Sequence, residues 1–258
     1  MDSSPLIITN HGLISQTPPI WFSELYNATL GKWTFNNADS VICYTIEEKN
    51  KLIDIGVKSN IRVIHNGINS QLFSPNEEEE NLILWVGRFL SGKGVEYLIE
   101  AFSILSKNHS GLKLLLVGDG PQKRGILEKA VNLGVRDKIS IKNFVPNEEM
   151  PTIYRGSKVF VLPSLSEGVP RTILEAMSCE VPVVSTDLPQ IRNLVSDCGF
   201  LVPKKNPVAL AEAIDRLLSD EDLRKKFCIN GRDKIKRNYT WQETVENTVE
   251  LYKECVCD

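Results

Sequence analysis

Residues 163–177 read PSLSEGVPRTILEAM, and they join the end of a predicted strand to the start of a predicted helix. The apolar run Val159–Leu162 before them predicts a buried strand. Gly168 allows a close approach of the backbone, and Pro170 suits the first position of a helix. The opening turn of that helix then presents the free N–H groups of residues 171–173. Free N–H groups at a helix N-terminus favour an anion, so this turn predicts an anion-binding site.

Two glutamates flank the same turn. Glu167 lies in the loop ahead of the helix, and Glu175 follows eight residues later in its second turn. Carboxylates accept hydrogen bonds from hydroxyls, while the helix N-terminus holds an anion. The pair therefore suits a ligand that carries both hydroxyls and phosphates, such as a nucleotide-sugar. The alternative is a solvated loop glutamate and a helix-surface glutamate, which is the commoner outcome for an isolated pair at this spacing.

Residues 166–177, SEGVPRTILEAM, resemble the signature of the retaining glycosyltransferases of family 4, which have the GT-B fold. In that family the first glutamate faces the donor sugar and the second holds the nucleotide ribose, so the resemblance gives these roles to Glu167 and Glu175. Val169 stands where the family often has phenylalanine, a departure that concerns the sugar pocket. The donor-binding residues that the resemblance implies in this turn are Gly168, Val169, Pro170, Arg171 and Thr172.

Two cations follow another predicted strand, in the sequence GRFLSGKG at residues 87–94. Lys93 stands at the start of the next helix, where a cation opposes the helix dipole at a cost of a few tenths to about 1 kcal/mol. Residues that are unfavourable for the local structure are expected at functional sites, so this lysine is a site candidate. A lysine that points into water, without a role in the site, is an alternative of equal weight. The string resembles the family's G-R-(x4)-K-G motif, whose arginine and lysine grip the donor diphosphate. Gly87, Arg88 and Lys93 take that role by resemblance, and a guanidinium fork and a mobile ammonium suit phosphate oxygens.

Further site candidates lie at other strand ends. Gly118 lies in the strand-to-helix turn LVGDGP, where glycine lets the backbone approach a ligand, although this signal alone is weak. Phe144 and Val145 resemble the segment that receives the nucleobase, with a core phenylalanine as the alternative. His11 lies in TNHG, which resembles the family's T-x-H-G turn near the transferred sugar. It is a catalytic candidate, against the alternative of a structural histidine.

The composition predicts a globular chain. It has 258 residues, 42% of them hydrophobic, and a net charge of -3 that gives no general basis for nucleic-acid binding. No apolar run approaches the ~18 residues that span a bilayer, and the first residues lack a signal-peptide pattern. The six cysteines form no C-x2-C pair, so neither a disulfide scaffold nor a zinc site is predicted. We expect a cytoplasmic protein with at most peripheral contact with the inner face of a membrane.

Strands and helices alternate along the chain, which predicts an α/β fold. Residues 1–74 supply about three strands. An independent α/β domain usually takes ~100–150 residues, so we expect a partial N-terminal, acceptor-side domain there. Residues 74–81 contain a proline and four consecutive glutamates, the composition of a solvated linker. Residues 75–239 predict a complete, doubly wound, Rossmann-like parallel sheet that binds its ligand at the carboxyl ends of the strands. Residues 240–258 carry an amphipathic helix, which in the family crosses back onto the N-terminal domain.

The predicted elements follow from the apolar periodicity. The strands are 6–9, 40–44, 61–65, 82–86, 113–117, 138–142, 158–162, 182–185 and 200–202. The helices are 21–34, 47–55, 94–106, 122–133, 148–155, 171–179, 190–195, 208–219 and 240–254. The last helix is predicted from the spacing of Trp241, Val245, Val249 and Tyr252.

The resemblance implies a retaining, metal-independent glycosyltransferase without a cofactor, which moves a sugar from a UDP- or GDP-sugar to a hydroxyl of a glycan or lipid-linked acceptor. Two alternatives remain open. One is a nucleotide-sugar-binding subunit or a truncated, inactive relative, which needs a separate N-terminal-domain protein as its partner. The other is a nucleotide-sugar epimerase of the same GT-B fold. The short N-terminal region is explained by a fragment, by an error in the gene model or by a split enzyme. The base, the sugar and the acceptor do not follow from the sequence.

Overall fold

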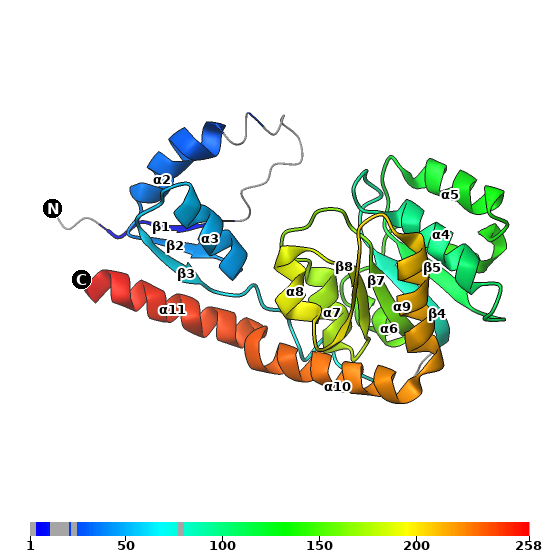
Figure 1. Ribbon diagram of the computed structural model, residues 1–258. Helices are drawn as coiled ribbons and strands as arrows, with labels where there is room; N and C mark the ends of the chain where they lie inside the picture. Colours follow the sequence, from blue (N-terminus) through cyan, green and yellow to red (C-terminus); the bar gives the residue numbers. More distant parts are fainter. Residues whose placement is uncertain (1–3, 11–20, 22–24, 77–79, 258) are drawn as a thin grey trace. The chain divides into compact units, whose positions relative to one another are not determined.

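The computed structural model describes most of the chain (Figure 1). The described residues are 4–10, 21, 25–76 and 80–257. Contacts between residues divide the chain into two compact units. The first is Met1–Gly67 together with Asn238–Asp258, and the second is Ile68–Arg237. Each unit has its own parallel sheet and its own hydrophobic core.

The first unit contains a three-stranded parallel sheet with the strand order β1-β2-β3. Its strands are β1 (Ile7–Thr9), β2 (Ser40–Cys43) and β3 (Asn60–Val63). Its helical segments are η1 (Asn27–Gly31, a π-helix), α2 (Lys32–Asn36), α3 (Ile46–Asp54) and α11 (Trp241–Cys257). All four residues of the central strand β2 are buried, as expected for a strand covered on both faces.

The helix α11 packs onto this sheet through a face that is partly polar. Leu251, which is 1% exposed, packs with Ile42 and Ile64. The Thr244 hydroxyl donates to the carbonyl of His65 at 2.8 Å and accepts from the N–H of Gly67 at 3.0 Å. The apolar stripe from which this helix was predicted is exposed instead. Its members Trp241, Val245, Val249 and Tyr252 are each between 43% and 59% exposed.

The second unit contains a six-stranded sheet in which every pair of neighbouring strands is parallel. Its strands are β4 (Glu80–Val86), β5 (Lys113–Val117), β6 (Ile139–Lys142), β7 (Ser157–Leu162), β8 (Val183–Thr186) and β9 (Gly199–Val202). The order is β6-β5-β4-β7-β8-β9, so the chain builds the sheet outward from β4 in one direction and then from β7 in the other. The α/β fold with a doubly wound parallel sheet is therefore confirmed.

Seven helices of the second unit accompany this sheet within the described residues (Figure 1). They are α4 (Val95–Leu105), α5 (Lys123–Asn132), α6 (Met150–Arg155), α7 (Arg171–Ser178), α8 (Pro189–Val195), α9 (Pro207–Ser219) and α10 (Glu221–Asn238). One core cluster joins α4, α5 and α9 to the sheet and includes Val159 and Val161 of β7. Phe160, between these two valines, points to the opposite face and packs against Tyr154 of α6.

The predicted elements of this unit are all present, and their ends differ by at most two residues. The helix predicted at residues 21–34 differs more, since the described part of it has a π-helical turn, Asn27–Gly31, before α2. The helix α10, 18 residues long, has no counterpart among the predicted helices. Its buried residues are Arg224, Gly231, Arg232 and Ile235, so arginines and a glycine interrupt the apolar repeat on which such a prediction depends.

Arg232 of α10 also explains where the second unit begins. Its guanidinium donates to the carbonyl oxygens of Ser70 (2.9 Å), Phe73 (2.7 Å) and Ser178 (2.6 Å). Ser178 ends α7, where a cation is favoured by the helix dipole. These bonds hold the segment before β4 against the second sheet, and the compact unit accordingly begins at Ile68, ahead of the predicted division at residue 74.

Candidate functional site

The two motifs singled out by the sequence follow neighbouring strands at the centre of the second sheet. Residues 87–94 follow β4 and residues 163–170 follow β7. These strands are hydrogen-bonded neighbours, and the chain order reverses between them. In open α/β sheets the loops at such a reversal diverge to opposite faces and leave a crevice at the carboxyl ends of the strands. The candidate site therefore lies where this fold binds ligands.

Backbone contacts hold these two loops together. The N–H of Leu165 donates to the carbonyl of Gly92 at 2.8 Å. Gly94 has a φ of +69°, and a Cβ there would lie 2.0 Å from the carbonyl oxygen of Pro163. Gly94 also forms the N-cap of α4, so the start of this helix rests directly on the end of β7. Only glycine permits this approach, which fixes the distance between the motifs.

Lys93 and Glu167, both predicted catalytic residues, form an ion pair across this contact. The Lys93 Nζ lies 2.7 Å from the Glu167 Oε1, and their side chains are 20% and 10% exposed. This pair explains how a lysine is tolerated just before a helix N-terminus, because the carboxylate supplies the negative charge that the dipole favours. The alternative of a lysine that points into water is wrong.

Arg88 is exposed, and its backbone is held on both sides by the loop that follows β5. The N–H groups of Gly87 and Phe89 donate to the carbonyls of Val117 and Asp119, each at 2.9 Å. Gly118 has a φ of +137°, and a Cβ there would lie 1.8 Å from the Gly87 carbonyl oxygen. The sequence assigned Gly118 an approach to a ligand, whereas here the missing side chain makes room for the neighbouring loop. That packing fixes the base of the Arg88 side chain.

The helix α7 begins at residue 171 as predicted, but Pro170 precedes its first position rather than occupying it. Pro170 is the N-cap, with an extended backbone (φ -76°, ψ 106°), and Arg171 is the first helical residue. The N–H of Ile173 donates to the Pro170 carbonyl at 3.1 Å, so it is not free, which corrects the expectation of three free groups. A tight first turn commonly uses such a bond. We find no partner for the N–H groups of Arg171 and Thr172 among the described residues.

The Gly168 turn faces open space, since a Cβ at Gly168 would have no atom within 4 Å in the described structure. Val169 beside it is half-buried. Phe144, after β6, is 82% exposed, and Val145 is half-buried. The alternative of a core phenylalanine at position 144 is therefore wrong. His11, the remaining catalytic candidate, lies outside the described residues.

Glu175 has a partner that the sequence did not indicate. The hydroxyl of Tyr154 donates to the Glu175 Oε2 at 2.7 Å. Burial raises the pKa of Glu175, while the hydrogen bond from Tyr154 and the charge of Arg171 lower it. Burial also raises the pKa of Tyr154 well above its usual value, and the carboxylate beside it raises it further. A tyrosine at an apolar position of a short helix is typical of a core residue, so the pattern gave no signal for this contact.

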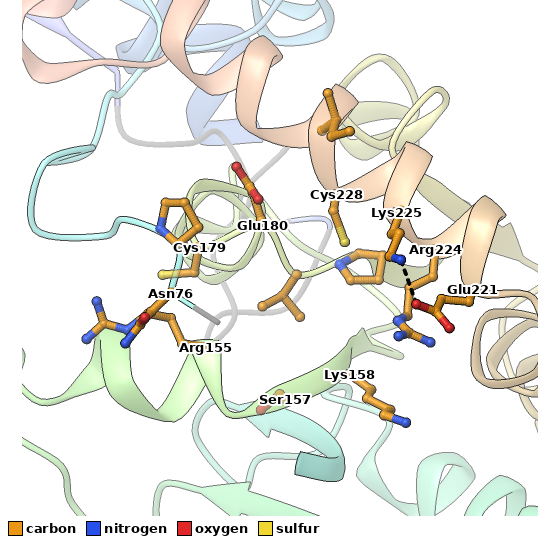
Figure 2. Close-up of a pocket in the computed structure, with 14 residues that line it drawn as sticks. Asn76, Arg155, Ser157, Lys158, Cys179, Glu180, Glu221, Arg224, Lys225 and Cys228 are labelled. Carbon is orange, nitrogen blue, oxygen red and sulfur yellow. Dashed lines mark ion pairs between the residues drawn. The ribbon is translucent and has the colours of Figure 1, made fainter. Parts of the chain in front are cut away.

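A cavity of about 320 Å³ lies elsewhere in the second unit (Figure 2). Its lining includes Ser157, the first residue of β7, and Val181 and Pro182 just before β8. It therefore opens at the amino ends of these strands, opposite to the two motifs. Figure 2 shows Cys179 in its wall, whose thiol has a pKa raised by burial to about 12. A thiol with that pKa is protonated at neutral pH and is a poor nucleophile.

Two kinds of feature are absent from the described ranges of the chain. None of the helices there has both the length and the apolar character to cross a membrane. No cluster of three or more histidine, cysteine, aspartate or glutamate side chains suitable for a metal ion occurs there.

Comparison with known families gives two matches. The family model of glycosyl transferases group 1 matches residues 69–234, and that of glycosyltransferase family 4 matches residues 2–72. The first match covers well over half of the chain and contains both motifs described above.

Individual relatives agree with these matches. An uncharacterized glycosyltransferase of Methanocaldococcus jannaschii is 32% identical over 256 residues, which are 98% of this chain and 69% of that protein. A second uncharacterized glycosyltransferase of the same organism is 31% identical over 75% of this chain and 54% of its own length. The chain thus spans about half to two thirds of the length of these curated relatives.

Solved structures share the fold. Sucrose-phosphate synthase from Thermosynechococcus elongatus is 26% identical, with a TM-score of 0.83 over 96% of this chain and 67% of that one. HepE of Anabaena, solved in complex with UDP and glucose, is 19% identical, with a TM-score of 0.85 over 97% of this chain and 72% of that one. The expected GT-B fold is confirmed by these neighbours. With its fold, its two strand-end motifs and its sequence matches in agreement, the chain belongs to the glycosyl transferases group 1 family.

Proposed function

We propose that this chain binds a UDP- or GDP-sugar and serves a retaining glycosyltransferase of family 4, which moves the sugar to an acceptor hydroxyl. The observation that carries the proposal is the meeting of the two motifs at the reversal of strand order. There the Lys93–Glu167 ion pair, the exposed Arg88 and the N-terminus of α7 surround the crevice side of the sheet. Cations and free N–H groups suit a diphosphate, and carboxylates suit the hydroxyls of a sugar.

In this proposal Arg88, Lys93 and the N–H groups of Arg171 and Thr172 stabilise the charge that develops on the leaving diphosphate. Fixed cations and a helix end supply this stabilisation without a metal ion or another cofactor. The leaving phosphate takes the proton of the acceptor hydroxyl, so the site needs no separate general base. Glu167 orients the sugar once the diphosphate engages Lys93.

The other donor contacts extend along the strand ends. Glu175 holds the ribose, and the exposed Phe144 with Val145 receives the base. UDP is the first ligand to test, since HepE, whose fold this chain shares, was solved with UDP and glucose. The acceptor class is a glycan or a lipid-linked sugar, and His11 is assigned to the acceptor side of the transferred sugar.

A binding subunit without activity of its own is the second candidate, in which a separate chain supplies the acceptor domain. The two candidates share the donor site and differ in turnover. Release of UDP from a UDP-sugar, measured with and without an acceptor mixture, separates them. The pairing of E-x7-E with G-R-(x4)-K-G favours both over an epimerase.

Titration calorimetry with UDP in the presence of EDTA tests the shared part of the proposal. We expect binding that is unchanged by EDTA and by added magnesium. Arg88→Ala should weaken UDP binding by about 1.5–3 kcal/mol, the range for hydrogen bonds between charged groups. Arg124→Ala is the matched control, since this arginine lies on α5 with its side chain 91% exposed, and it should have no effect. Binding that requires a divalent ion, or an equal effect of both variants, contradicts the proposal.

A further inference from the structure

We propose that Tyr154 is a positioning residue that holds one oxygen of Glu175, so that the other oxygen is presented to the two hydroxyls of the nucleotide ribose. The inference rests on the proposed function, because it concerns how the proposed ribose carboxylate is held. It adds a residue that neither motif contains and assigns it an effect on ligand selectivity.

The geometry of Tyr154 leaves its hydroxyl little freedom. The side chain is fully buried on α6. Its ring meets the ring of Phe73 edge-on, with the centroids 6.0 Å apart, and lies 5.7 Å from the ring of Phe160. A ring fixed between two others in a close-packed core keeps one orientation, and the hydroxyl at its end keeps one position. Tyr154 therefore offers Glu175 a rigid donor.

Glu175 is the partner that this donor can orient. It lies in the second turn of α7 and is only partly buried. An ionised carboxylate has about four acceptor positions on its two oxygens. Oε2 accepts the 2.7 Å bond from Tyr154, and we find no second donor to this carboxylate in the described part of the chain. Oε1 is thus the oxygen with acceptor capacity to spare.

The same bond favours the ionised form of Glu175. The Glu175 carboxylate interacts electrostatically with three charged or titratable groups. They are Tyr154 from α6, Arg171 from its own helix and Cys179 just beyond that helix. Burial raises the pKa of Glu175, and the Tyr154 hydroxyl opposes this change. Because burial raises the pKa of Tyr154 itself, the hydroxyl stays protonated and remains a donor at neutral pH. Only the ionised carboxylate can accept from both ribose hydroxyls with either oxygen.

Selectivity between ribose and deoxyribose follows from this arrangement. A fixed, ionised Oε1 accepts bonds from the vicinal 2′ and 3′ hydroxyls together, and a ligand that lacks the 2′ hydroxyl leaves one acceptor position unmatched. A carboxylate that can rotate, or that is protonated, discriminates less. The ratio of the dissociation constants of 2′-deoxy-UDP and UDP therefore reports on Tyr154.

The experiment measures both dissociation constants by calorimetry from pH 5 to pH 8, for the full chain and for Tyr154→Phe. The ratio cancels the titration of the diphosphate, which the two ligands share. In the unchanged protein we expect UDP to bind on the order of tenfold more tightly than 2′-deoxy-UDP, as one hydrogen bond to a charged group implies. In Tyr154→Phe the preference should fall to about twofold or less, and its loss toward low pH should begin at higher pH, because Glu175 has lost the donor that lowers its pKa. Tyr252→Phe, which removes an exposed hydroxyl on α11, should leave both ligands unaffected.

The outcomes separate the two claims. If the unchanged protein binds neither nucleotide, the proposed function fails. If it binds UDP and Tyr154→Phe keeps both the preference and its pH dependence, only the role of Tyr154 is overturned. Should Tyr154→Phe not fold, Glu175→Gln decides the matter at the other end of the bond, and a wild-type ratio in that variant overturns the inference.

Discussion

Lys93 and Glu167 neutralise each other between the loops that follow two adjacent strands. Side chains that are 20% and 10% exposed have lost most of their water, and the cost of removing two charges from water is offset only when the two remain paired. The candidate site thus contains its own counter-ion. Each residue could be selected from the sequence by its motif, but their pairing could not, because it depends on the 2.8 Å contact between Leu165 and Gly92.

At this scale we predict that Lys93→Ala weakens UDP binding by about 1.5–3 kcal/mol and leaves uridine binding unchanged. The ammonium acts on the diphosphate, which uridine lacks. The variant should also unfold more easily, since it leaves Glu167 largely buried without its partner. Calorimetry with both ligands and denaturant unfolding provide the two measurements.

The double variant Lys93→Ala/Glu167→Gln separates binding from folding. Removing both charges should restore much of the free energy of unfolding while UDP binding stays weak. Equal losses for UDP and uridine would show that Lys93 acts through folding alone.

The helix α10 shows why an element can escape sequence analysis. The helix α4 was predicted because Val95, Leu98 and Ile99 begin an apolar repeat that is buried in the structure. The residues that α10 buries include two arginines and Gly231, where a Cβ would lie 3.4 Å from Met177. Leu223, Phe227 and Ile235 also pack on the core, but a glycine and two buried guanidinium groups interrupt their apolar period.

The helix α11 illustrates the reverse case. Its apolar spacing predicted the helix correctly, yet the exposed side carries that stripe. Thr244 and Leu251 lie on the packed side, where the Thr244 hydroxyl bonds to the backbone of His65 and Gly67. Helical periodicity therefore located the element but did not determine which face is buried.

Arg232 is the residue through which α10 can be tested. Replacement by methionine removes the donors to the Ser70, Phe73 and Ser178 carbonyls and leaves these oxygens without the guanidinium. We expect Arg232→Met to lower the free energy of unfolding by about 3 kcal/mol. Arg237→Met, an exposed change on the same helix, should stay within about 0.5 kcal/mol. Urea unfolding of both variants gives the comparison, and similar midpoints would contradict the role of Arg232.

At the scale of the whole molecule, the division into two compact units predicts which part of the chain a bound ligand stabilises. Each of the candidate donor residues that the structure describes belongs to the unit Ile68–Arg237. A ligand that binds only the folded state stabilises it by about 2.7 kcal/mol at one hundred times its dissociation constant. UDP should therefore slow hydrogen exchange in peptides of residues 80–237 and leave peptides of residues 25–66 unchanged.

Uridine at the same molar concentration is the control for this exchange experiment, because it lacks the diphosphate and should protect less. Equal protection of both units by UDP would place a donor contact in the first unit. The fold class of the second unit, a doubly wound parallel sheet, was within reach of the sequence because the alternation of strands and helices and the strand-end motifs are local. The boundary at Ile68 was not, because it depends on Arg232, which lies far along the chain from the segment that it holds.

The ion pair at the reversal of strand order also bears on how the site responds to salt. Before a ligand binds, Lys93 and Glu167 cancel each other's charge, and both remain in the site when the proposed diphosphate engages Lys93. Binding to such a site gains less from long-range attraction, which mobile ions screen, than binding to an open cluster of cations does. A site that contains its own carboxylate counter-ion should therefore bind chloride, sulfate and free phosphate only weakly. Its affinity for UDP should vary only slightly with ionic strength.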